Sequence, residues 1–182
     1  MSEEVYLGLG SNLGDRADNI HKALSLLQGK TQLKAVSSLY ETAPMYFPSQ
    51  PHFLNAVCCV FTDMQPFELF TFIKGVELSL GRRPTLPKGP RIIDIDVLLY
   101  GSLALDTPLL TIPHPAMTER AFVLVPLVEI APEVVHPVLK ITAAELLKMV
   151  EGKEGVRLWL PSRKSGSQDA WSALAHGSTG PP

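Results

Sequence analysis

The chain has 182 residues, a hydrophobic content of 46% and a formal net charge of −2 at pH 7. This length suits one domain with a proper core, and the small net charge gives no sign of a broad nucleic-acid or membrane surface. The first residues lack the basic start and apolar block of a signal peptide, and no apolar run reaches the roughly 20 residues of a membrane helix. We therefore expect a cytoplasmic protein.

The first half of the chain predicts three strands and two helices. Residues 4–12 form a strand that ends in a Gly/Ser/Asn turn, and the helix that follows has apolar residues at helical spacing and stops at Gly29. Residues 33–44 are a second strand candidate, and residues 52–63 alternate as a strand does. Residues 66–81 begin with proline and end with glycine, which is typical of a helix.

The two cysteines, Cys58 and Cys59, are neighbours in the predicted strand over residues 52–63. Adjacent cysteines in a strand point to opposite faces and rarely form a disulfide. We expect two buried thiols in a reducing compartment.

The second half begins with a basic, proline-rich loop at residues 82–91 that leads into a strand within residues 89–101. Residues 101–132 mix short strands, turns and a helical segment near their end. Thr142 and Glu145 have the spacing of a capping box at the start of the last helix.

The order of these elements favours an α+β fold with a largely antiparallel sheet over a doubly wound parallel sheet. Residues 1–160 are expected to form the domain. Residues 161–182 are polar, rich in Gly and Ser, and aperiodic, so we expect a disordered tail.

Two acidic residues interrupt the apolar strand "GPRIIDIDVLLYG". Side chains alternate along a strand, so Asp94 and Asp96 share one face with their Cα atoms roughly 6.5 Å apart, whereas Ile93, Ile95 and Val97 take the face toward the core. Like charges at this range destabilise one another unless they are bridged, and Mg²⁺ prefers one or two carboxylates together with substrate phosphates. The alternative is a half-exposed strand with two solvated acids.

The loop before this strand supplies four bases, at Arg82, Arg83, Lys88 and Arg91. Carboxylates for a metal beside bases for phosphates are the composition of a phosphoryl-transfer site. A charge-balanced surface loop has the same composition, so these residues alone leave both possibilities open.

Two further groups have the composition of a binding site. Phe53 and Asn55 share a strand face, and an aromatic ring beside an amide suits a flat heterocycle, although a core Phe with a capping Asn is the alternative. Thr111, His114 and Arg120 could reach a nucleotide, but a single His is more often structural.

The segment "GLGSNLGD" does not have the spacing of a dinucleotide-binding fingerprint. It predicts a strand–turn–helix in which the backbone at Gly8 and Gly10 approaches another group closely.

Six segments in the same order, over about residues 4–160, resemble the 6-hydroxymethyl-7,8-dihydropterin pyrophosphokinase family of folate biosynthesis. They are "LGSNLGD", "TAPM", "QPHFLNAV", "VELSLGR", "GPRIIDIDVLLYG" and "IPHPAMTERAFVLVPLVEIAP". The resemblance implies a three-layer α-β-α sandwich with a ferredoxin-like core. It also implies a transferase that moves pyrophosphate from ATP to the hydroxymethyl group of the dihydropterin and releases AMP.

The resemblance assigns roles to residues of this chain. It implies two magnesium ions held by Asp94 and Asp96, with Arg82 and Arg91 in the catalytic set beside them. The implied pterin pocket comprises Thr42, Pro44, Met45, Phe53, Asn55 and Phe122. The implied ATP side comprises Glu77, Arg91, Thr111, His114 and Arg120. The partners are then small molecules, without nucleic acid or membrane, and we expect a monomer.

The loop over residues 82–88 departs from the family pattern. Arg83 is shifted by one position, Pro84 occupies the place of an arginine, and Pro87-Lys88 stand in place of an Arg-Trp pair. Leu109 also occurs where relatives often have a base. The loop closes over the substrates in the family, as catalytic lids do, and we expect two prolines to stiffen it.

The altered loop makes a ligand-binding or regulatory domain the main alternative to the enzyme. Such a domain would keep the pterin pocket without efficient catalysis. A metal-dependent nucleotide phosphohydrolase would also use the acidic pair and the basic loop, but it gives no reason for Phe53 and Asn55.

Overall fold

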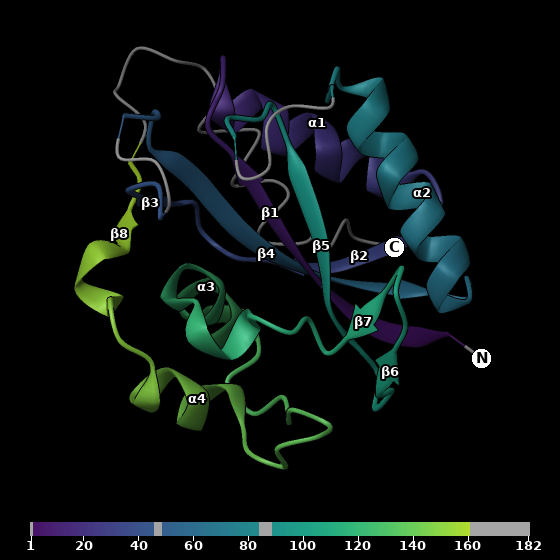
Figure 1. Ribbon diagram of the computed structural model, residues 1–182. Coiled ribbons are helices and arrows are strands. Elements are labelled where there is room, and N and C mark those ends of the chain that lie inside the picture. Colours follow the sequence, from purple (N-terminus) through teal and green to yellow (C-terminus); the bar gives the residue numbers. More distant parts are fainter. Residues whose placement is uncertain (1, 46–48, 84–88, 161–182) are drawn as a thin grey trace, which may run out of the picture.

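The computed structural model describes residues 2–45, 49–83 and 89–160. Within these ranges a six-stranded antiparallel sheet has helices on both faces, which confirms the predicted α+β sandwich (Figure 1). The elements in chain order are β1 (Glu3–Ser11), α1 (Arg16–Gln28), β2 (Gln32–Val36), β3 (Tyr40–Thr42), β4 (Phe53–Thr62), α2 (Pro66–Ser79), β5 (Asp94–Tyr100), β6 (Leu105–Asp106), β7 (Thr111–Ile112), the 3-10 turn η1 (Met117–Glu119), α3 (Ala121–Ile130), α4 (Ala143–Met149), the 3-10 turn η2 (Lys153–Gly155) and β8 (Arg157–Leu158).

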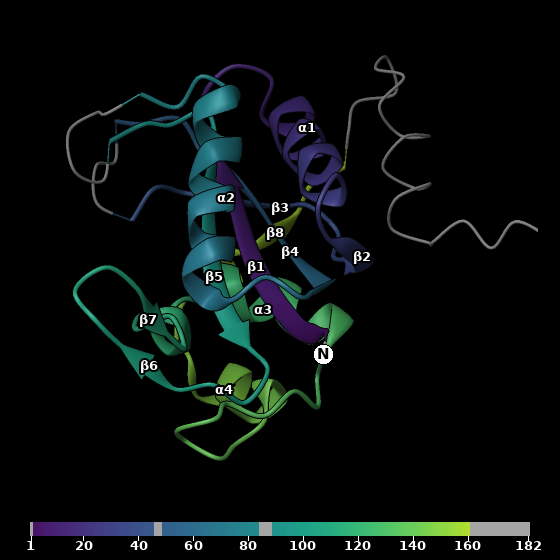
Figure 2. The same ribbon diagram turned by 90° about the vertical axis from the view of Figure 1, so that its right-hand side faces the viewer.

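The strand order is β5-β1-β4-β3-β8, and β2 also pairs with β4. Strand β1 therefore lies between β4 and β5, which carry the two predicted groups of site residues. Strands β6 and β7 form a separate hairpin (Figure 2).

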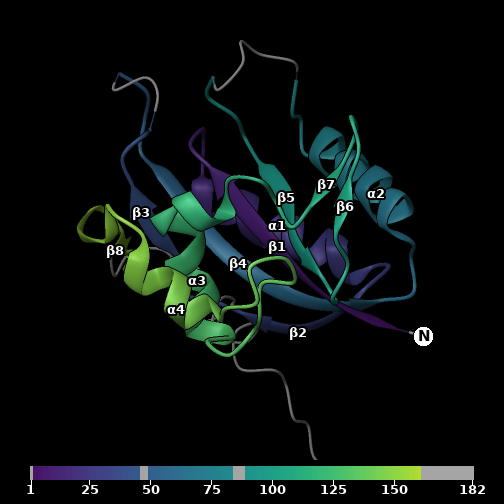
Figure 3. The same cartoon turned by 60° about the horizontal axis from the view of Figure 1, so that its bottom comes forward.

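Each face of the sheet has its own hydrophobic core. Leu7 and Ile95 belong to the core under α1 and α2, whereas Leu98 and Leu124 belong to the core under α3 and α4. Figure 3 shows α3 and α4 in front of the sheet and α1 behind it. The site residues therefore take their backbone from a sheet that is packed on both faces.

The two cysteines confirm the predicted alternation along β4. Cys58 is buried in the core under α1 and α2, and Cys59 is buried in the core under α3 and α4. Both are free thiols. Burial raises the pKa of the Cys58 thiol and raises that of Cys59 to about 11, so both are unreactive at neutral pH.

One strand prediction was wrong, because residues 33–44 form two strands. Strands β2 and β3 both pair with β4 and are separated at Ser37. The Val57 N–H donates to Ser37 Oγ at 3.0 Å, while the Ser37 N–H donates to the Val57 carbonyl at 2.9 Å. A side-chain oxygen thus takes the place of a backbone acceptor, which interrupts the ladder.

Other local predictions are confirmed. The capping box of Thr142 and Glu145 is present at α4, and α1 ends at Gly29. No helix in the described ranges is both long enough and apolar enough to cross a membrane. The predicted tail at residues 161–182 lies outside the described residues, so the division of the chain at residue 160 stays a prediction.

Candidate active site

A cavity of about 360 Å³ opens over β5, β1 and β4, on the face that also carries α3. It brings together most of the predicted site residues, although they come from five parts of the chain. Its lining includes Thr42, Pro44, Met45, Phe53, Asn55, Arg82, Arg91, Asp94, Asp96, His114, Arg120 and Phe122.

Glycines of β1 form the floor of the cavity between the acidic residues of β5 and the aromatic residue of β4. Gly8 pairs with Asp96 on β5, and Gly10 pairs with Asp94 on β5 and with Asn55 on β4. A Cβ atom added to Gly10 would lie 3.3 Å from Asn55 Oδ1, which is tight. Because paired residues project to the same face, these glycines leave the cavity continuous from the acidic strand to the aromatic one. The predicted close approach is therefore present at Gly10, whereas a Cβ atom at Gly8 would lie at an ordinary 3.4 Å from Leu98 Cδ2.

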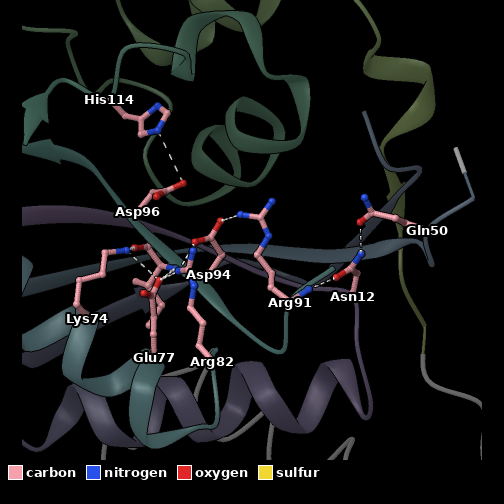
Figure 4. A network of polar contacts seen from close by, with 10 residues as sticks. Asn12, Gln50, Lys74, Glu77, Arg82, Arg91, Asp94, Asp96 and His114 are labelled. Carbon is pink, nitrogen blue, oxygen red and sulfur yellow. Dashed lines mark hydrogen bonds and ion pairs between the residues drawn. The ribbon is translucent and has the colours of Figure 1, made fainter. Parts of the chain in front are cut away.

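Arginines compensate the first acid. Asp94 Oδ1 accepts from the Arg82 guanidinium and Asp94 Oδ2 accepts from the Arg91 guanidinium, both at 2.6 Å (Figure 4). Such charge-assisted bonds fix both the carboxylate and the loop residues that reach it. A carboxylate has about four lone-pair sites, so each oxygen of Asp94 retains acceptor capacity.

The second acid is much less compensated. Among the described residues the ion-pair partner of Asp96 is His114, with 3.8 Å between Oδ2 and Nε2. Burial and the nearby Asp94 charge raise the pKa of Asp96, whereas His114, Lys74 and Arg120 lower it. His114 Nδ1 accepts from the Ala116 N–H at 3.2 Å, so the neutral imidazole carries its proton on Nε2, facing Asp96.

The other end of the cavity is aromatic and amide-lined. Phe53 and Asn55 project from the same face of β4, as predicted, and Asn55 Nδ2 donates to Thr42 Oγ1 at 2.9 Å. That bond orients the buried amide. Phe122 of α3 contributes a second ring to the lining.

Arginine links the aromatic end to the acidic end. The Arg91 guanidinium carbon lies 5.8 Å from the centre of the Phe53 ring, while the same side chain binds Asp94. Arg120 has a similar position over Phe122, at 5.7 Å. Cation–π contacts of this kind hold both rings beside the charged groups.

Two predicted nucleotide-side residues lie outside the cavity lining. Glu77 is 2% exposed and lies beneath Lys74 and Arg82, with which it forms ion pairs. Thr111 Oγ1 donates to Asp106 Oδ1 at 3.1 Å in the β6–β7 hairpin, and it lines a second hollow beside that hairpin. Their roles toward a nucleotide stay predictions.

The sequence interpretation missed Lys74, Asn12 and Gln50. Lys74 and Gln50 line the cavity. Asn12 Oδ1 accepts from the Arg91 N–H at 2.8 Å, and Asn12 Nδ2 donates to Gln50 Oε1 at 3.2 Å (Figure 4). Asn12 thus joins the segment before β4 to the segment before β5. The sequence signal that could have indicated this role of Asn12 was its position just after β1, in the turn "GSN".

The departures predicted for the loop cannot be located, because residues 84–88, including Pro84, Pro87 and Lys88, lie outside the described residues. Arg83 is exposed and is not among the lining residues of the cavity. Leu109 is 64% exposed, on the turn between β6 and β7.

The donor set fits a hard divalent cation. Two carboxylates face one cavity, and the raised pKa of Asp96 reflects burial and a like charge that a cation would relieve. The described residues contain no group of three or more His, Cys, Asp or Glu arranged to hold a metal. Mg²⁺ suits such a site, because it commonly uses one or two carboxylates and completes its shell with phosphate and water.

Comparisons with known proteins agree with this fold and site. Residues 6–132 match the family described as 7,8-dihydro-6-hydroxymethylpterin-pyrophosphokinase (HPPK). The enzyme named 2-amino-4-hydroxy-6-hydroxymethyldihydropteridine pyrophosphokinase is 39% identical in Bacillus subtilis, over 91% of this chain and 95% of that protein. The Aquifex aeolicus protein of the same name is 44% identical, over 75% of this chain and 85% of its own length. The chain therefore belongs to the HPPK family.

Longer proteins also contain a similar region. The folic acid synthesis protein FOL1 of Dictyostelium discoideum is 46% identical over 76% of this chain, but the match covers 21% of that protein. This chain thus spans about a fifth of the length of that relative. Plasmodium falciparum HPPK-DHPS has a similar fold, with a TM-score of 0.68 and 18% identity, over 81% of this chain and 43% of that one.

Proposed function

We propose that this protein transfers the pyrophosphoryl group of ATP to the hydroxymethyl group of 6-hydroxymethyl-7,8-dihydropterin and releases AMP. Membership of the HPPK family supports this activity. The observation that carries it is that one cavity contains both groups, with Asp94, Asp96 and arginines across two glycines from Phe53 and Asn55. An anion-binding end beside a flat, hydrogen-bonding end suits a nucleotide triphosphate and a pterin together.

In this proposal the substrate hydroxyl attacks the β-phosphorus of ATP. A new P–O bond forms to the hydroxymethyl oxygen, the bond from the β-phosphorus to the oxygen that bridges it to the α-phosphate breaks, and AMP leaves with that oxygen. The hydroxyl proton is lost to solvent. Such transfers need positioning and charge neutralisation more than covalent help from the protein.

Asp94 and Asp96 would hold two magnesium ions, which supply Lewis-acid polarisation of the phosphate oxygens. Arg82 and Arg91 orient Asp94 and bring positive charge to the cavity. Arg120 and His114 line the same end and would contact phosphate oxygens. Phosphate binding of this kind depends on charge-assisted bonds.

Phe53 and Phe122 would enclose the pterin ring, and Asn55 would bond its edge. Asn55 is 5% exposed, so a ligand that pairs with its amide is favoured over one that cannot. Thr42, Pro44 and Met45 would close the pocket around the ring. We also propose that the protein acts as a cytoplasmic monomer.

A titration with a non-hydrolysable ATP analogue and Mg²⁺, with and without the dihydropterin, tests this assignment. We expect analogue binding that requires Mg²⁺ and pterin binding in the presence of the analogue. Mutual exclusion of the two ligands would contradict two subsites in one cavity.

A further inference from the structure

Strand β5 forms one edge of the main sheet. One of its sides pairs with β1, and within the described ranges no strand of this sheet pairs along the other side. An edge strand leaves backbone N–H and C=O groups that need other partners. Leu98 has one of these, since its carbonyl accepts from the His114 N–H at 2.9 Å.

Side chains of α2 satisfy the edge at Ile95. The Ile95 N–H donates to Glu77 Oε1 at 2.7 Å, and Lys74 Nζ donates to the Ile95 carbonyl at 3.3 Å. Lys74 Nζ also lies 3.0 Å from Glu77 Oε1. Lys74 and Glu77 point toward one another (Figure 4). They therefore close a ring with the Ile95 backbone and replace the pair of bonds that a neighbouring strand would make.

Ile95 is the residue between the two acids of the site. Its N–H belongs to the peptide that joins it to Asp94, and its carbonyl belongs to the peptide that joins it to Asp96. Each peptide plane between the two carboxylates is thus held by one bond from α2. The backbone torsions that set the separation of these carboxylates lie between those two bonds.

Burial of Glu77 makes this contact costly to break. Glu77 is 2% exposed, and desolvation raises its pKa, while Lys74, the Ile95 N–H and Arg82 favour the ionised form. A buried carboxylate with these partners is expensive to displace, because any movement leaves a charge or an N–H unpaired.

We propose that Lys74 and Glu77 form a clamp on Ile95 that fixes the spacing of Asp94 and Asp96 for divalent-cation binding. Lys74 and Glu77 are then positioning residues for the metal end of the site. This inference rests on the proposed function, since that function gives the two aspartates their metal. Partners of this type around a metal site commonly change metal affinity about 10–100-fold when removed.

The double variant Lys74→Met/Glu77→Leu removes the clamp. Arg82 loses Glu77 but keeps its bond to Asp94, so no buried charge is left without a partner, and such exchanges are often tolerated. Two quantities are measured on the full chain. The first is the Mg²⁺ concentration at half-maximal binding of a non-hydrolysable ATP analogue. The second is the hydrogen-exchange rate of the Ile95 amide without ligand, which does not depend on activity.

We expect the half-maximal Mg²⁺ concentration to rise about tenfold, and the Ile95 amide to exchange faster. Lys74→Arg keeps a cationic donor and should restore near wild-type Mg²⁺ dependence. Lys22→Met removes a lysine that pairs with Asp18 on α1, far from the cavity, and should change neither quantity.

Four outcomes would contradict the clamp or the metal site on which it rests. Unchanged Ile95 exchange, or faster exchange with an unchanged Mg²⁺ midpoint, overturns the clamp. Weaker analogue binding at every Mg²⁺ concentration with unchanged Ile95 exchange also overturns it, because Lys74 would then contact phosphate directly. A wild-type chain without Mg²⁺-dependent binding overturns the proposed metal site itself. If the double variant does not fold, Lys74→Met alone decides by the same criteria, since this side chain is 34% exposed.

Discussion

Replacing Asp96 with alanine should abolish transfer while leaving the fold intact. Asp96 has a 37% exposed side chain, and its ion-pair partner among the described residues is His114 at 3.8 Å, so little native contact is lost. Its charge lies near that of Asp94. If the charges are taken to be as far apart as the Cα atoms of alternate strand residues, roughly 6.5 Å, they repel by about 2.5 kcal/mol at an effective dielectric constant of 20. Solvent exposure and salt reduce this to under about 1 kcal/mol.

We therefore expect the free energy of unfolding of Asp96→Ala to stay within about 1 kcal/mol of wild type. Activity should fall at least about 100-fold, the usual loss when one group that stabilises transition-state charge is removed. The assay is AMP release per folded molecule, with denaturant unfolding measured on the same samples. Asp18→Ala is the control, because Asp18 is also a partly exposed carboxylate, paired with Lys22 on α1.

The pH dependence gives the same prediction a second test. Partial desolvation and the Asp94 charge raise the pKa of Asp96 above its ordinary value of 3.8, so the folded state favours the protonated form. The stability that the protonated carboxyl group contributes is fully present below pH 3.8 and is lost as the pH rises through the raised pKa. Asp96→Ala should lack this loss. A variant that unfolds several degrees earlier, yet keeps full activity per folded molecule, would refute the reasoning.

Other predictions use the remaining parts of the structure. Phe53→Ala should weaken pterin binding by about 1–3 kcal/mol and leave Mg²⁺-dependent analogue binding unchanged in calorimetry; equal losses for both ligands would contradict separate subsites. Cys58 and Cys59 should resist a thiol reagent until the chain unfolds, and fast labelling of native protein would disprove their burial. Burial and the Glu129 carboxylate raise the pKa of Tyr40 from 10.0 to about 12, so the stability that the protonated Tyr40 contributes should be lost as the pH rises from 10 through 12. Unfolding measurements over this pH range should show the loss in the wild type and not in Tyr40→Phe. The same pH profile in both proteins would argue against this role of Tyr40.

The alternation of side chains along strands accounts for what could be predicted of the site. It placed Asp94 and Asp96 on one face of β5, and Phe53 and Asn55 on one face of β4, and the cavity contains all four. It also gave the opposite face of β5 to the core, where Ile95 is buried. Local spacing is enough for such statements because a strand fixes it.

The contacts between elements could not be predicted in the same way. Lys74 and Glu77 are three residues apart, a spacing that is common on any helix and predicts no function. Only the packing of α2 against the edge of β5 brings these side chains to Ile95. Asn12 likewise bonds Gln50 and Arg91, which are far from it in the sequence. The break in the strand over residues 33–44 depends on a hydroxyl that substitutes for a backbone acceptor, which strand periodicity does not reveal.

The central claim is that one cavity holds both substrates for direct transfer. Its most direct test is to incubate the chain with ATP, Mg²⁺ and 6-hydroxymethyl-7,8-dihydropterin and to quantify nucleotide and pterin products together. The proposal predicts AMP and the diphosphorylated pterin in equal amounts, and no AMP when the pterin is omitted. AMP formed without the pterin would indicate a phosphohydrolase, and binding of both substrates without AMP would indicate a binding domain; either result would contradict the account.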